Sequence, residues 1–211
     1  MDDIIYILFV SIFVPIMLMA LLVEKKARFP ILFMLVGIFF SVFASEINGV
    51  LEDVLPMDMY SITVTVTPIT EEILKALPIL YYALVISDKR EKLFTASMAT
   101  GIGFAILENA YYLLSNPMFS MLNAVIRAFG AGLMHGMCTL LVGVGISFVK
   151  QRRKLFAVGT FGLLSTAIVY HGIYNILIQS DYSAVGALLP IATYIPFFIW
   201  RLNLKHRKKS A

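Results

Sequence analysis

Several ionisable and amide side chains lie inside stretches of sequence that are otherwise apolar. They are Glu71, Glu72, Lys75, Glu108, Asn109, Arg127, His135, His171 and Asn175. An unpaired charge at the centre of a bilayer costs about 2.5–3.5 kcal/mol, so a membrane protein keeps such residues only where they are paired or hydrated. Ionisable residues inside apolar spans therefore indicate a functional site.

Two carboxylates and two imidazoles around one pocket are suited to activating water. A carboxylate can take a proton from water, and an imidazole or an Asn amide can donate hydrogen bonds to a developing oxyanion. His135 and His171 with Glu72 and Glu108 would also form a plausible ligand set for zinc. The sequence contains no serine elbow, Gly-rich phosphate loop or HExxH motif that would assign a different chemistry.

Helical spacing relates Lys75 to both neighbouring glutamates. Glu71 precedes Lys75 by four positions and Glu72 by three, so Lys75 can reach either carboxylate. Consecutive helical residues diverge by about 100°, so the two carboxylates cannot point the same way. We expect one to face the reacting centre and the other to pair with Lys75 or hold a break at Pro68.

Two further i,i+4 pairs put polar groups on shared helix faces: His171 with Asn175, and Phe104 with Glu108. Each residue also has a purely structural interpretation. A Glu–Lys pair can be a buried ion pair, a membrane histidine can bond a backbone carbonyl, and Asn175 can link helices for about 1 kcal/mol. The functional interpretation depends on all these residues sharing one depth, from the midplane toward the outer face.

His135 lies between Gly132 and Gly136, a small-xxx-small pattern that permits close helix approach. The pattern predicts that the imidazole lies near the backbone of a neighbouring helix. Arg127 lies two turns before His135 and is placed to neutralise a carboxylate.

The composition requires a lipid environment for the elements that carry these residues. Of 211 residues, 60% are hydrophobic and 14% charged, against about 25% charged in soluble domains, and mean hydropathy is +0.87. This excludes a soluble or disordered protein, because there is too little polar surface to cover so many apolar side chains. It also excludes a nucleic-acid-binding protein, because the basic residues responsible for the pI of about 9.1 lie in short clusters between apolar runs. The single cysteine, Cys138, excludes an internal disulfide.

We predict an all-α, polytopic membrane helix bundle that forms one transmembrane domain over 1–211. A span needs about 20 mostly apolar residues. Seven stretches qualify: 4–23, 30–48, 59–86, 93–114, 121–149, 155–178 and 184–202. Turn or charge signals such as Asn116-Pro117 separate them. The spans within 68–178, which carry the candidate site residues and over which a family resemblance described below extends, are the expected catalytic core, and a basic cytoplasmic tail is expected over 201–211.

The third span contains Pro68 and Pro78 and opens with a β-branched run. With Thr67 as N-cap and Pro68 as first helical residue, a new helix would begin inside the membrane. We therefore expect the span to be broken near Pro68. The alternative is one long tilted helix with kinks.

Basic residues predict the orientation. Three Lys or Arg fall in 24–29, three in 87–92, four in 150–154 and five in 201–211, while the alternate connections carry acids. Seven spans with the N-terminus outside and the C-terminus in the cytoplasm put every basic cluster on one side.

Four motifs in order resemble the PrsW family of bacterial intramembrane proteases. Glu71-Glu72-x-x-Lys75 reads as EExxK, Phe104 to Asn109 as FxxxEN, Arg127 to His135 as R-x7-H, and His171 to Asn175 as HGxYN. The resemblance implies a bacterial cell-membrane enzyme that hydrolyses a peptide bond within or beside the bilayer. Its expected partner is a single-span membrane substrate, cut near its extracytoplasmic side as the first cleavage of an anti-sigma factor.

The family is also similar to the CAAX-processing prenyl endopeptidases. That similarity implies that Glu71 or Glu72 activates water and that His171 with Asn175 forms an oxyanion hole. Here Lys75 stands in place of an arginine one residue later, and Glu108 in place of a histidine, so His135 would substitute. Glu108 and His135 would position water or bind a divalent metal such as zinc, with Lys75, Phe104, Asn109 and Arg127 in support.

Two other classes of function keep buried polar residues. A proton-coupled transporter or channel would also retain carboxylates and a broken helix. However, seven spans show no inverted repeat, and the polar residues share one depth. A non-enzymatic membrane scaffold of the protease fold is the other alternative, against which stands the retention of all four motifs.

Overall fold

The computed structural model describes residues 3–115, 121–149 and 153–209, and every regular element among them is helical. In chain order the elements are α1 (Asp3–Leu22), α2 (Lys25–Val54), α3 (Met59–Ser61), the π-helix η1 (Ile62–Val66), α4 (Thr67–Tyr81), the π-helix η2 (Tyr82–Ile86), α5 (Arg90–Ser115), α6 (Met121–Ile146), α7 (Arg153–Ile178) and α8 (Ser183–Lys209). The predicted all-α bundle is confirmed. Six predicted spans each coincide with one long helix, and the third with the run from α3 to η2.

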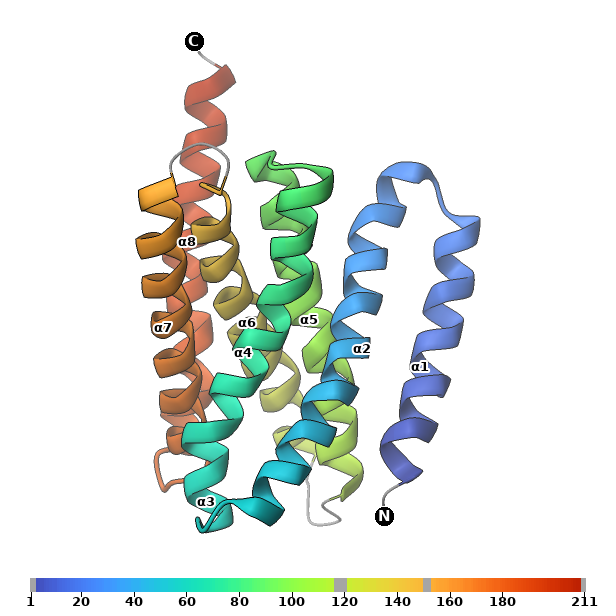
Figure 1. Ribbon diagram of the computed structural model, residues 1–211, viewed down its shortest axis with the longest axis vertical. Helices are drawn as coiled ribbons and strands as arrows, with labels where there is room; N and C mark the ends of the chain where they lie inside the picture. The colour runs from blue at the N-terminus through green and yellow to red at the C-terminus, as the bar shows by residue number, and fades with distance from the viewer. Residues whose placement is uncertain (1–2, 116–120, 150–152, 210–211) are drawn as a thin grey trace.

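The long helices run antiparallel to their chain neighbours (Figure 1). The most extensive packing joins α5 to α2 and to α6, followed by α6 against α7. Helix α1 stands at the edge against α2 and is mostly exposed, as expected of a helix that faces lipid. Helix α6 is the most buried of the candidate spans, and α4, α5 and α7 pack against it, so polar residues on the faces between these helices are shielded from lipid.

Four described stretches are long and apolar enough on their own to cross a membrane: Ile4–Leu22, Lys25–Val54, Ala124–Ile146 and Lys154–Ile178. The third span is divided into short pieces, and it carries Glu71, Glu72 and Lys75. α5 carries charges at its start and Glu108 near its other end. These helices place polar groups inside the bundle, which lowers their hydropathy without preventing burial.

The predicted break near Pro68 was wrong. The chain stays helical from Met59 to Ile86, and the irregularity is a π-helical segment, η1, directly before Thr67. Thr67 makes no side-chain capping bond, whereas Pro68 does lie in the first turn of α4. A π-helix absorbs one extra residue without ending the helix, so the β-branched run widens the helix there and the long-helix alternative holds.

Asp58 begins this run at the end of the bundle. Its carboxylate accepts hydrogen bonds from the Ser61 backbone N–H at 2.9 Å and the Ser61 hydroxyl at 2.8 Å. These donors lower the pKa of Asp58 below its usual value, and the cap satisfies N–H groups that the first helical turn leaves unpaired.

Glycines on α2 and α5 allow the closest helix contacts. A Cβ at Gly101 would overlap the backbone carbonyl of His135, and a Cβ at Gly37 would overlap the Thr100 carbonyl. The expected role of Gly132 was wrong, because nothing lies within 4 Å of a Cβ built there. The close approach at His135 does occur, but the glycine that permits it is on the partner helix.

The two ends of the bundle differ in charge as predicted. The α1–α2 connection, the η2–α5 connection and the C-terminal end of α8 lie at one end, and α3 lies at the other (Figure 1). Helix α8 extends to Lys209, so the predicted basic tail is helical up to that residue. The Asn116-Pro117 turn and residues 150–152 of the third basic cluster lie outside the described residues, and the side of the membrane that each end faces stays a prediction.

Candidate active site

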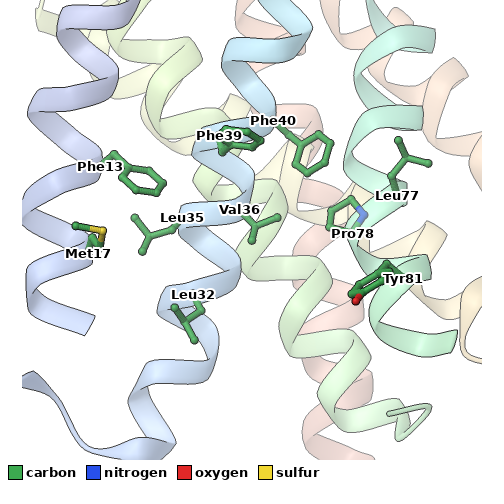
Figure 2. Close-up of a pocket in the computed structure, with 10 residues that line it drawn as sticks. All are labelled: Phe13, Met17, Leu32, Leu35, Val36, Phe39, Phe40, Leu77, Pro78 and Tyr81. Carbon is green, nitrogen blue, oxygen red and sulfur yellow. The ribbon is translucent and has the colours of Figure 1, made fainter. Parts of the chain in front are cut away.

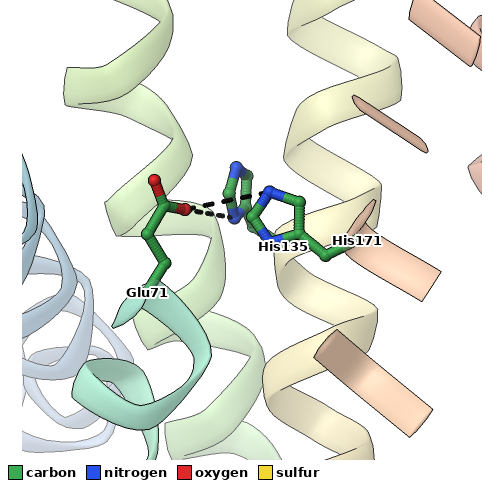
Figure 3. Close-up of side chains that lie close together, drawn as sticks. All are labelled: Glu71, His135 and His171. Atoms are coloured by element: carbon green, nitrogen blue, oxygen red, sulfur yellow. Dashed lines mark ion pairs between the residues drawn. The ribbon is translucent and has the colours of Figure 1, made fainter. Parts of the chain in front are cut away.

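Four different helices bring their ionisable side chains to one place inside the bundle. Glu71 comes from α4, Glu108 from α5, His135 from α6 and His171 from α7. Figure 3 shows Glu71, His135 and His171 pointing toward one another. One ligand atom from each of these three lies within 4.8 Å of those of the other two. The structure therefore brings these residues together at one depth, as the sequence predicted.

Glu71 is the glutamate that faces the shared space. Its Oε2 lies 3.9 Å from His171 Nε2 and 4.0 Å from His135 Nδ1. The residue is 6% exposed, and this oxygen has no hydrogen-bond partner among the described residues. A buried carboxylate oxygen without a partner is costly, so the geometry is that of a ligand or of a group that bonds water or substrate.

Glu72 points away from that space and organises the residues behind it. Its Oε1 accepts from Lys75 Nζ at 2.7 Å and lies 2.9 Å from His171 Nδ1. A carboxylate paired with an ammonium is ionised and only accepts, so His171 Nδ1 carries the proton and donates it. The lone pair of His171 is then on Nε2, which is the atom turned toward Glu71. The expected division of roles between the two glutamates is thus present, with Glu72 as the partner of Lys75.

Lys75 also orients His135. Its Nζ lies 2.7 Å from His135 Nδ1, and because an ammonium can only donate, Nδ1 is the acceptor and the neutral ring carries its proton on Nε2. His135 Nε2 lies 2.5 Å from Glu108 Oε2, although the two are not aligned as a hydrogen bond. Phe104 covers this group: its ring lies 5.3 Å from that of His135 and 4.6 Å from Lys75 Nζ.

Arg127 neutralises Glu108 at the edge of the cluster. One guanidinium nitrogen lies 3.4 Å from Glu108 Oε1, and the guanidinium lies 3.9 Å from the centre of the Tyr112 ring. Asn109 donates to the Arg127 backbone carbonyl at 3.3 Å, so it ties α5 to α6 and does not face the histidines. Tyr112 was not among the residues selected from the sequence. It directly follows Tyr111, and a pair of tyrosines in an apolar span is indistinguishable from packing residues.

Asn175 lines the polar cavity and uses one of its two amide N–H groups for a contact with η1. Its amide Nδ2 donates to the backbone carbonyl of Thr63 at 3.0 Å. Thr63 lies in the π-helix η1, where widened geometry leaves carbonyls in need of partners. The residue therefore joins α7 to η1 through one N–H, and an oxyanion contact through the other N–H stays a prediction.

The cluster lies along a cavity of about 580 Å³ with a mixed polar and apolar lining. Glu71, Glu108, Arg127 and His171 line it, whereas Glu72, Lys75 and His135 are fully buried behind its wall. On the α2 side the lining consists of Ser41, Ser45, Asn48, Gly49 and Glu52. The sequence reasoning missed these residues, although their spacing of four, three and four positions between polar side chains was a signal that one face of α2 is polar.

A second cavity, of about 680 Å³, is apolar and lies between α1, α2 and α4 (Figure 2). Phe13 and Met17 of α1 face Leu35 of α2, and Leu77 and Pro78 line its α4 side. Its lining is apolar apart from the phenol of Tyr81. None of the residues of the polar cluster lines it.

A divalent metal fits the polar cluster by the chemistry of its donors. Two imidazoles and a carboxylate make up a common catalytic zinc set. The carboxylate oxygen of Glu71 is buried and unpartnered, and the His171 lone pair faces it. A carboxylate behind a ligating histidine, as Glu72 is behind His171, is the usual second partner at such sites. Binding through His135 Nδ1 requires Lys75 to release that atom.

Fold and site together define a helical membrane protein with a buried Glu, His, His cluster beside a polar cavity, an arrangement suited to hydrolysis inside a membrane. The chain matches the PrsW family of intramembrane metalloproteases over residues 25–201 and belongs to that family. No curated protein and no solved structure gives a significant match. The protein is thus an intramembrane peptidase, and the family favours this class over the transporter and scaffold alternatives.

Proposed function

We propose that this peptidase cleaves a single-span membrane protein near the extracytoplasmic face of a bacterial cell membrane, with an anti-sigma factor as the substrate class. The convergence of Glu71, His135 and His171 on the polar cavity carries the proposal. The cavity extends to Glu52 on α2 and Gln179 after α7, at the end opposite the basic connections. Positive residues favour the cytoplasmic side, so this opening would face outward.

Glu71, His135 and His171 would hold the metal ion. When bound, a divalent ion supplies Lewis acidity that polarises a carbonyl and makes water easier to deprotonate. Glu72 keeps His171 oriented, and Lys75 holds Glu72 in place. Glu72 is fully buried behind the cavity wall, so this proposal does not assign it as the base.

Glu108 is the general base of this proposal. Its carboxylate lines the cavity beside the cluster and remains partly exposed. It would accept the proton of the attacking water and deliver it to the departing amine, a role worth about 10²–10⁴ in rate. Arg127 would keep Glu108 ionised and offset the negative charge that develops on the substrate carbonyl.

Cleavage of a reconstituted single-span anti-sigma-factor substrate, measured together with metal content, tests this function. We expect one equivalent of metal per chain, loss of cleavage on chelation and recovery on adding zinc. Glu71→Gln and His171→Ala should each lose both metal and cleavage while the protein stays folded. Full cleavage by both variants, or by metal-free protein, would refute the assigned site. Cleavage of other single-span proteins but not of anti-sigma factors would refute only the substrate class.

A further inference from the structure

One face of α2 is polar although the helix crosses the membrane. Ser41, Ser45, Asn48 and Glu52 recur at intervals of four, three and four positions, which puts them on one side of the helix. All four line the polar cavity, as does Gly49. None of them belongs to the ionisable cluster, and the proposed hydrolysis assigns them no role.

Asn48 has an unused acceptor in this wall. The residue is 8% exposed, and its Oδ1 is buried with no hydrogen-bond partner among the described residues. The opposite wall differs: the Thr63 hydroxyl donates to the Met59 carbonyl of its own helix at 2.8 Å, and the Thr63 carbonyl accepts from Asn175. Outside the ionisable residues Glu71, Glu108 and Arg127, Asn48 Oδ1 on the α2 side is therefore the buried unsatisfied side-chain atom among the described residues that line this cavity.

The cavity is also long enough for an extended chain. Ser41 and Glu52 are eleven residues apart, or about 16 Å along a helix. A strand rises about 3.3 Å per residue, so this wall spans about five residues of extended peptide. Gly49 leaves the middle of the wall open, since nothing lies within 4 Å of a Cβ built there.

A membrane-spanning substrate requires hydrogen-bond partners for its backbone where it is cleaved. Its scissile bond is accessible only when the helix unwinds, and each N–H or C=O released inside the membrane costs several kcal/mol unless it is paired. We propose that the Ser41–Ser45–Asn48–Gly49 face of α2 binds the unwound backbone of the substrate, with Asn48 Oδ1 accepting a hydrogen bond from a substrate N–H. This subsite rests on the proposed function and adds to it how the substrate is held.

Recognition of backbone predicts binding that depends little on substrate sequence. The probe is therefore a synthetic single-span peptide of Leu and Ala with one Gly-Pro pair near its outer end and a fluorophore at that end. Binding to the full chain is measured by fluorescence anisotropy in proteoliposomes, with Glu71→Gln as the background to prevent turnover.

Three substitutions in that background separate the subsite from general effects. Asn48→Leu removes the acceptor at similar volume, and Gly49→Leu fills the open middle of the wall. Gly162→Leu is the matched control, since Gly162 is exposed on α7 outside the cavity and its Cβ would also meet nothing within 4 Å. We expect Asn48→Leu and Gly49→Leu to weaken binding at least about tenfold, Gly162→Leu to leave it unchanged, and Asn48→Gln to restore part of the loss.

Equal affinity in all variants, or no binding of the probe even to the Glu71→Gln protein, would overturn the inference. Hydrolysis by chains with Glu71 intact is scored separately: Asn48→Leu should raise KM with little change in kcat. An unchanged KM in Asn48→Leu and Gly49→Leu would refute the proposed subsite without affecting the assignment as a peptidase. The variants could lose probe binding as predicted while the unmodified chain hydrolyses no single-span protein. That result would refute the proposed cleavage and support the subsite.

Discussion

His171 Nδ1 lies 2.9 Å from Glu72 Oε1, a carboxylate 99 positions earlier in the chain. This contact determines which nitrogen of His171 carries the proton and turns the other toward Glu71. Lys75 contributes by pairing with the same oxygen of Glu72. A single buried ion pair thus fixes the orientation and the protonated nitrogen of a histidine on a different helix.

Removal of the charge on Glu72 should weaken metal binding without removing a ligand. We expect Glu72→Gln to lower metal affinity about 10–100-fold, the usual effect of losing the carboxylate behind a ligating histidine. Competition with a chelating dye measures it, and Glu108→Gln is the comparison because Glu108 is no ligand in the proposed site. Unchanged affinity in Glu72→Gln would show that His171 does not depend on this contact.

Glu108→Gln should separate metal binding from turnover. The amide keeps the shape but cannot take a proton from water, so kcat should fall about 10²–10⁴-fold with metal content unchanged. Stopped assays on the reconstituted substrate, with metal measured on the same preparations, provide both numbers. A fall of less than about fivefold would assign the base elsewhere.

The Glu72–Lys75 pair should show strong coupling in stability. Both side chains are fully buried, and removing one partner of a buried pair typically costs about 3–5 kcal/mol. We expect Lys75→Met to destabilise the protein by that order and Glu72→Gln with Lys75→Met to recover a large part of the loss, as measured by unfolding in mixed micelles. Additive losses in the double variant would mean that the two residues act independently.

Asn175→Ala should affect stability more than chemistry. Its amide is engaged by the Thr63 carbonyl, so the substitution leaves a carbonyl of η1 without a partner at a cost of about 1–3 kcal/mol. We predict a lower unfolding midpoint and a kcat within a few-fold of the parent at a temperature where both proteins are folded. A kcat loss of two or more orders of magnitude in folded protein would instead support the oxyanion role.

The sequence by itself determined that this chain is a membrane helix bundle and which ionisable residues inside its spans could come together. Apolar runs and basic clusters alternate along the chain, and in lipid each run must satisfy its own backbone as a helix. The same logic selected Glu71, Glu108, His135 and His171, because charge inside such a run is retained only for pairing or function. These are local properties, readable from spacing alone.

The tertiary structure decided the partners, which depend on helix rotation and packing. Whether Glu71 or Glu72 faced the cavity followed from how α4 is turned against α7. The close approach at His135 depended on Gly101 of α5, which meets both His135 and Gly136, and not on Gly132. Asn175 donates to the Thr63 carbonyl of η1, a segment that is a π-helix where the sequence predicted a break. The polar face of α2 could be identified as a cavity wall only from the tertiary structure, which places it opposite α4. The sequence of one helix does not determine which helix packs across from it.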